Sequence, residues 1–87
     1  MNKINEIITL YGQLKKALLK VPQRPNFFET MKNANDSLTD EKKAMLKDIR
    51  TFRNQVANSS EVPKVPANYQ EWIDFMNEEI AILNGRT

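Results

Sequence analysis

The strongest structural signal in the sequence is the segment 39–58, which reads TDEKKAMLKDIRTFRNQVAN. Thr39 is a typical N-cap residue, and Asp40 and Glu41 follow it where the helix dipole favours acids. Apolar residues then recur three or four positions apart, which is the spacing that lines one face of a helix. The segment therefore predicts a helix over 40–58 whose core face carries Met45, Leu46, Ile49, Phe52 and Val56.

The same apolar spacing predicts three further helices on either side of this segment. The first covers about residues 2–20, and a short one covers about 27–35 after an N-cap at Asn26. Glu29 completes a capping box with Asn26, and the last helix covers about 69–84 after a second capping box, formed by Asn68 and Glu71. Prolines in the segments between these helices disfavour helical continuation. We therefore expect an all-α fold, a small antiparallel bundle of three long helices plus one short helix.

Length and composition indicate a single helical-bundle domain over residues 1–87. The chain has no cysteine and no histidine, which excludes disulfides, thiolate metal sites and the usual general base near neutral pH. Its first residues lead into no uninterrupted apolar run, and no stretch reaches 18 apolar residues, so we expect neither a signal peptide nor a membrane span. We expect a cytoplasmic protein that is not an enzyme, holds no cofactor or metal and does not bind a membrane.

Charge is unevenly distributed along the chain. Residues 1–28 hold five lysines or arginines against one glutamate, whereas residues 68–87 hold one arginine against four acids. One interpretation is a basic helix packed beside an acidic one, with solvated faces. The other is a basic footprint for nucleic acid or for an acidic partner. The first is favoured, because an acidic helix nearby would repel phosphate.

Two of the predicted helices carry apolar residues outside their main stripe. These are Leu10 and Leu19 in the first helix, and Phe75 and Ile82 in the last. A stripe this wide is typical either of a helix sandwiched within a bundle or of a second apolar face that meets another subunit. We therefore expect a partner protein or a homodimer, with Trp72, Phe75 and Ile82 among the candidate binding residues.

One polar motif stands out at the end of the central helix, where residues 50–58 read RTFRNQVAN. Arg50 lies one helical turn before Asn54, and Arg53 and Asn58 occupy the last turns. Such side chains either cap the final carbonyls of the helix or present polar groups to a cleft. All four residues are candidate binding residues, and no residue is assigned a catalytic role.

This motif resembles the ribonuclease signature of HEPN-domain proteins, in which an arginine and a polar neighbour precede a histidine. Arg53 matches the arginine, Asn54 the polar neighbour, and Asn58 stands where the histidine would be. The resemblance implies a compact helical bundle whose dimerisation brings two copies of the motif together. Asparagine has no titratable nitrogen for the proton transfer that the family's histidine performs. The resemblance therefore implies a non-catalytic member, or a copy inactivated by substitution.

Together these features predict a non-catalytic helical module that binds and regulates a partner protein. By analogy, a chain of this size suits a small bacterial or phage regulator or inhibitor of the antitoxin, immunity or anti-defence type. The alternative is an RNA-binding or degenerate HEPN-like ribonuclease module. That alternative would use the basic first helix together with Lys43, Lys47, Arg50 and Arg53, and its RNA binding would weaken steeply with salt.

Overall fold

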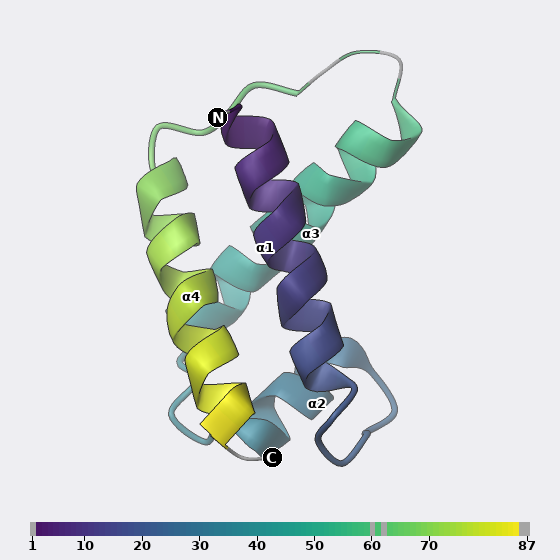
Figure 1. Cartoon of the computed structure of the whole chain (residues 1–87), viewed down its shortest axis with the longest axis vertical. Coiled ribbons are helices and arrows are strands. Elements are labelled where there is room, and N and C mark those ends of the chain that lie inside the picture. The colour runs from purple at the N-terminus through teal and green to yellow at the C-terminus, as the bar shows by residue number, and fades with distance from the viewer. Residues whose placement is uncertain (1, 60, 62, 86–87) are drawn as a thin grey trace.

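The computed structural model describes residues 2–59, 61 and 63–85, and within them it contains four α-helices and no strand (Figure 1). The all-α fold with three long helices and one short helix is therefore confirmed. Each observed helix boundary lies within two residues of the predicted one. The helices are α1 (Lys3–Leu18), α2 (Phe27–Ala34), α3 (Asp40–Asn58) and α4 (Tyr69–Gly85).

The predicted N-caps Asn26 and Thr39 supply side-chain hydrogen-bond partners for free N–H groups at the starts of α2 and α3, whereas α4 begins on a backbone hydrogen bond. The side chains of Asn26 and Thr39 each accept a hydrogen bond from the N–H three residues further on, at 2.9 and 3.2 Å. At the start of α4 the backbone carbonyl of Asn68 accepts the N–H of Glu71 at 3.0 Å. These bonds satisfy donors that have no partner within the helix, so they mark where each helix begins.

The two helices that pack most extensively, α1 and α4, run in the same direction (Figure 1). At their first turns, the Lys3 ammonium lies 5.0 Å from the Tyr69 ring centroid and the Tyr69 hydroxyl donates to Glu6 at 3.4 Å. At the other end of the pair, Lys20, just after α1, and Asn84 of α4 line one hollow. The predicted antiparallel arrangement therefore does not describe this pair, because the chain reverses direction twice between α1 and α4.

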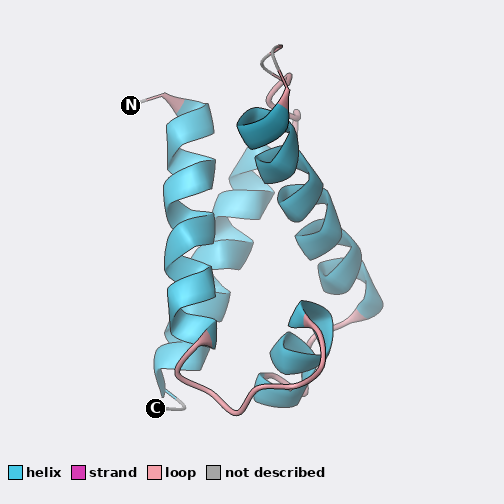
Figure 2. Ribbon diagram, turned by 90° about the vertical axis from the view of Figure 1, so that its right-hand side faces the viewer, coloured by secondary structure: helices cyan, strands magenta, loops and turns pink. Residues whose placement is uncertain are grey.

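The core lies between the helices and is built from the predicted apolar stripes. Phe52 of α3 packs edge-on against Trp72 of α4, with ring centroids 5.7 Å apart and an interplanar angle of 77°. The short α2 lies beneath the bundle, at the end where α1 and α4 finish (Figure 2). The largest apolar side chains with no exposed area are Ile7, Leu14, Met31, Leu46, Ile49, Met76 and Leu83.

A buried carboxylate links the connection after α2 to α4. Glu79 has no exposed area, and its two carboxylate oxygens accept hydrogen bonds from Asn35 Nδ2 at 3.0 and 2.8 Å. Asn35 is fixed in turn, because its Oδ1 accepts the N–H of Ser37 at 3.0 Å and its own N–H donates to the Met31 carbonyl. A charged group buried in this way requires hydrogen bonding, and Asn35 supplies it.

Burial raises the pKa of Glu79 above its ordinary value of 4.5. The hydrogen bond from Asn35 and the positive charge of Lys42 act in the opposite direction, and the negative charge of Glu78 adds to the rise. Because the folded chain holds this proton more tightly than the unfolded chain, the associated stability is complete below pH 4.5 and is lost as the pH rises through the folded-state pKa.

We predict that Glu79→Gln flattens the pH dependence of the free energy of unfolding, because glutamine keeps the shape and an oxygen acceptor for Asn35 but does not titrate. Urea denaturation at several values between about pH 4 and pH 8 measures the slope. The matched control is Glu78→Gln, an exposed neighbour in the same helix, and it should retain the decline in stability with rising pH. If the free energy of unfolding depends on pH equally in Glu79→Gln and in the unmodified chain, the raised pKa of Glu79 does not cause that dependence.

Candidate functional site

The structure does not bring the four predicted polar residues of α3 into one cleft. Arg53 is half-buried and lines a hollow of about 340 Å³ between α1 and α3. Asn54 and Asn58 are exposed and do not line that hollow. Arg50 is exposed, and its guanidinium carbon lies 5.8 Å from the centroid of the Phe28 ring. Of the four, only Arg53 therefore borders this hollow.

The three candidate residues of α4 belong wholly or partly to the core. Trp72 and Phe75 are each only 5% exposed, and Ile82 is half-buried. The wide apolar stripe on α4 was expected to reflect either a helix sandwiched within the bundle or a face that meets another subunit. The burial of Phe75 fits the first of these explanations. Neither aromatic side chain lies on a surface that a partner could reach in the folded chain.

Leu19 is the off-stripe residue that packing leaves uncovered. Its side chain is 75% exposed, and it is the one exposed large hydrophobic residue in the part of the chain that the structure describes. Leu10, by contrast, packs against the core. The backbone at Leu19 is held in place, because its N–H donates to the carbonyls of Lys15 and Lys16, both at 3.2 Å. A fixed backbone and an uncovered side chain make Leu19 a candidate contact residue.

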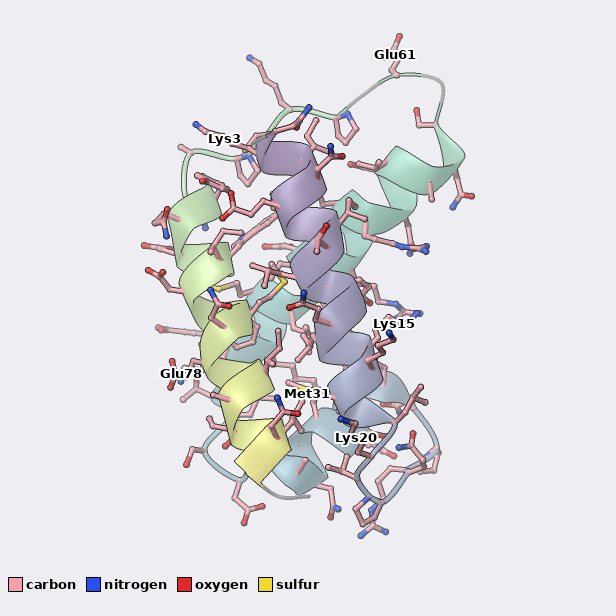
Figure 3. All side chains as sticks on the ribbon, in the orientation of Figure 1. Lys3, Lys15, Lys20, Met31, Glu61 and Glu78 are labelled. Atoms are coloured by element: carbon pink, nitrogen blue, oxygen red, sulfur yellow. The ribbon has the colours of Figure 1, made fainter. Side chains whose placement is uncertain are left out.

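Leu19 stands where two shallow hollows meet. The first, of about 340 Å³, lies between α1 and α3, and the second, of about 260 Å³, lies between the end of α1 and the start of α2. Lys15 lines both hollows and points away from α4 (Figure 3). We call this region the Leu19 surface, and we define it by Ile8, Gly12, Lys15, Lys16, Leu19, Arg24, Phe27 and Arg53.

The rim of the Leu19 surface is positively charged. Every charged side chain that lines the two hollows is a cation, namely Lys15, Lys16, Arg24 or Arg53. Within residues 2–59, 61 and 63–85, none of the four has a carboxylate within 4.0 Å. Arg24 does have a neutral partner, since its Nη2 donates to Asn33 Oδ1 at 3.0 Å. The surface thus combines an aliphatic centre with cations that form no ion pair within 4.0 Å in the described part of the chain.

Tyr11 lies beneath this rim and is only 4% exposed. The Lys15 ammonium lies 5.8 Å from its ring centroid. Burial raises the pKa of the Tyr11 hydroxyl, and the positive charges of Arg50 and Arg53 oppose that rise. Because the pKa remains above its ordinary value of 10.0, the phenol is neutral at physiological pH. Tyr11 therefore acts as a packing residue under the cations.

Comparison of the chain with protein-family models, with curated proteins and with solved structures finds no match. The HEPN resemblance consequently rests on the motif at residues 53–58. None of the helices in the described residues is long and apolar enough to cross a membrane. In the same part of the chain, no group of three or more metal-ligating side chains lies close enough together to hold an ion.

Gly12 is a feature of the Leu19 surface that packing within the chain does not explain. It lies in the interior of α1, where glycine costs about 1 kcal/mol relative to alanine. A Cβ atom built at this position would meet nothing within 4 Å. No close approach between helices inside the folded chain therefore requires a glycine there, and the position leaves open space in the hollow that Leu19 also lines.

We predict that Gly12→Ala raises the free energy of unfolding by about 1 kcal/mol, because alanine is the better helix former and the added methyl group meets open space. Urea denaturation monitored by circular dichroism measures the change. Gln13→Ala, at an exposed neighbouring position, serves as the control and should have a smaller effect. A loss of stability in Gly12→Ala would show that the position is not open.

Proposed function

We propose that the chain is a non-catalytic helical module that binds another protein through the Leu19 surface. The observation that carries this proposal is the 75% exposure of Leu19 at the junction of two hollows. Single exposed hydrophobic residues are common on protein surfaces. Leu19 differs from such a residue because its backbone is fixed, and because two hollows and the open position at Gly12 adjoin it. Covering a leucine side chain with a partner would contribute about 1.5–3 kcal/mol to binding.

We assign this module the role of a small bacterial or phage regulator or inhibitor in the cytoplasm, of the antitoxin, immunity or anti-defence type. The support is the small helical fold together with the lack of histidine and cysteine. A symmetric dimer through the Leu19 surface would place two sets of unneutralised cations against each other. We therefore assign that surface to a different protein and the proposed homodimer to another face.

The proposal retains antiparallel packing for the pair α3 and α4. Lys42, near the start of α3, lies 3.7 Å from Glu78 in the second half of α4. Phe52, in the second half of α3, packs against Trp72 near the start of α4. This packing orients α3 so that Arg53 borders the hollow beside α1.

The alternative function is an RNA-binding or degenerate HEPN-like ribonuclease module. Its support is the clustering of cations around α1 and α3, including Lys47 and Arg50. Both of these lie over the Phe28 ring, at 5.9 and 5.8 Å from its centroid, and Tyr11 is buried. Base stacking needs an open aromatic face, and these rings do not present one. We therefore place protein binding first.

We predict that neither the unmodified chain nor Asn58→His cleaves single-stranded RNA. Asn58 does not line the hollow that Arg53 borders, so a histidine there would not complete a site around the arginine. Incubation with a fluorescent oligonucleotide, followed by gel electrophoresis, measures cleavage. Arg53→Ala is the control for contaminating nuclease. Cleavage that is lost in Arg53→Ala would establish the ribonuclease alternative and contradict the proposal.

We predict that selection against the full chain yields peptides whose binding is strongly weakened by Leu19→Ser. The full chain is immobilised, and peptides that bind it are selected from a random library. Peptides that also bind the Leu19→Ser variant are then removed. For the remaining peptides, Leu19→Ser should weaken binding by about tenfold or more, because a buried leucine contributes about 1.5–3 kcal/mol.

The control for this selection is Asn77→Ser, on the exposed side of α4, which should bind every selected peptide normally. Circular dichroism should show both variants folded, since both positions are exposed. If repeated selection yields no peptide that depends on Leu19, the proposed function is wrong.

A further inference from the structure

We infer that the segment recognised by the Leu19 surface is an acidic stretch of protein in which carboxylates flank an apolar side chain. This inference rests on the proposed function and specifies the chemistry of its partner. It follows from three features of the surface: the sign of its charges, the aliphatic character of its centre, and the space beside α1.

The first feature is the uniform charge of the rim. Lys15, Lys16, Arg24 and Arg53 come from α1, the loop after it and α3, so three separate elements contribute cations to one surface. No described carboxylate lies within 4.0 Å of any of them, and although Arg24 also borders a third hollow with Glu29 and Asp36, no acid lines the two hollows of the Leu19 surface. Complementary potentials speed association and disfavour partners of the same sign. A partner with carboxylates at its edges fits this rim.

The second feature is the aliphatic centre. Leu19 protrudes between the hollows, and Ile8 lies on the same side of α1 and is half-buried. A phosphate backbone gains nothing from contact with a leucine side chain, whereas an apolar side chain of a peptide is removed from water by it. Tyr11 is buried and Phe28 lies under two cations. The half-buried Phe27 ring packs against both of these rings, with centroids 6.1 and 5.6 Å away. The centre therefore favours a protein segment over a nucleic acid.

The third feature is the open patch at Gly12. Residues 8, 12, 15, 16 and 19 share one side of α1, because they follow the spacing of three and four that defines a helical face. With no side chain at Gly12 and nothing within 4 Å of a Cβ built there, a partner backbone could lie close to the helix between Ile8 and Leu19. The two lysines would then reach carboxylates on either side of that contact.

The experiment uses the Leu19-dependent peptides from the selection described above. We expect aspartate and glutamate to be enriched in them relative to the library, next to an apolar residue. The double variant Lys15→Glu/Lys16→Glu should weaken their binding by about tenfold or more in 50 mM salt, because attraction at the rim becomes repulsion. Replacing their acids with the corresponding amides should weaken binding similarly, and raising the salt concentration should reduce the difference between acid and amide peptides.

The matched control is Lys43→Glu/Lys64→Glu, which changes the net charge by the same amount at exposed positions outside the two hollows. It should alter affinity by less than about twofold, because neither side chain lines the hollows and water and salt screen exposed charges that make no direct contact. A fluorescent single-stranded RNA is titrated in parallel and should show no binding that depends on Leu19.

The outcomes separate the two proposals. Peptides that depend on Leu19 but lack acids, or that bind equally well to Lys15→Glu/Lys16→Glu, would overturn the acidic partner and leave protein binding intact. RNA binding that exceeds peptide binding and is lost on reversing Lys15 and Lys16 would also overturn it. The absence of any Leu19-dependent peptide would instead be a failure of the proposed function itself.

Discussion

Burial of the apolar stripe of α1 is the constraint on which the rest of the structure depends. Ile7 and Leu14 have no exposed area, and α1 packs against both α4 and α3. With that stripe turned inward, the helical repeat places Gly12, Lys15 and Lys16 outward. Leu19 then follows the last helical residue with no element to cover it. The exposed surface is thus a consequence of how the core is filled.

Packing within the chain brings only some of the cations of the basic α1 into contact with the acidic α4. The basic α1 does lie beside the acidic α4, yet their described contacts at the first turns involve Tyr69, which meets Lys3 and Glu6. Lys15, near the end of α1, points away from α4 (Figure 3), whereas Lys16 and Lys20 border a hollow that α4 also lines. Lys15 and Lys16 remain available to a partner, because no acid within the described residues lies within 4.0 Å of either.

Local sequence signals predicted the helices well, because caps and apolar spacing act over a few residues. They did not identify which off-stripe residues would be covered. Phe75 and Leu19 have the same character in the sequence, but only the packing of distant helices buries one and exposes the other. The buried position of Glu79 is likewise not among the predictions from the sequence, in which it contributes only to the charge of the last helix. Its position three residues after Met76 placed it on the core face, a signal that helical spacing did contain.

Functional residues were harder to predict than the fold for a related reason. The motif at the end of α3 lies in one segment of the sequence, yet Arg53 lines a hollow whose other residues come largely from α1. The residues of the site come from separate helices and the loop after α1, whereas a sequence motif lies within one segment. Large aromatic residues such as Trp72 were predicted to contact a partner, but they are buried in the core, because a small domain has few other large apolar side chains to fill it.

The binding role of the Leu19 surface is tested most directly by nuclear magnetic resonance. The full chain, labelled with nitrogen-15, is titrated with an acidic peptide obtained by selection, and the backbone amide shifts are mapped onto the structure. Binding at this surface predicts the largest shifts at Gly12, Lys15, Lys16 and Leu19, with α4 residues such as Asn77 unchanged. Shifts concentrated on the outer face of α4, with those four amides unmoved, would contradict it.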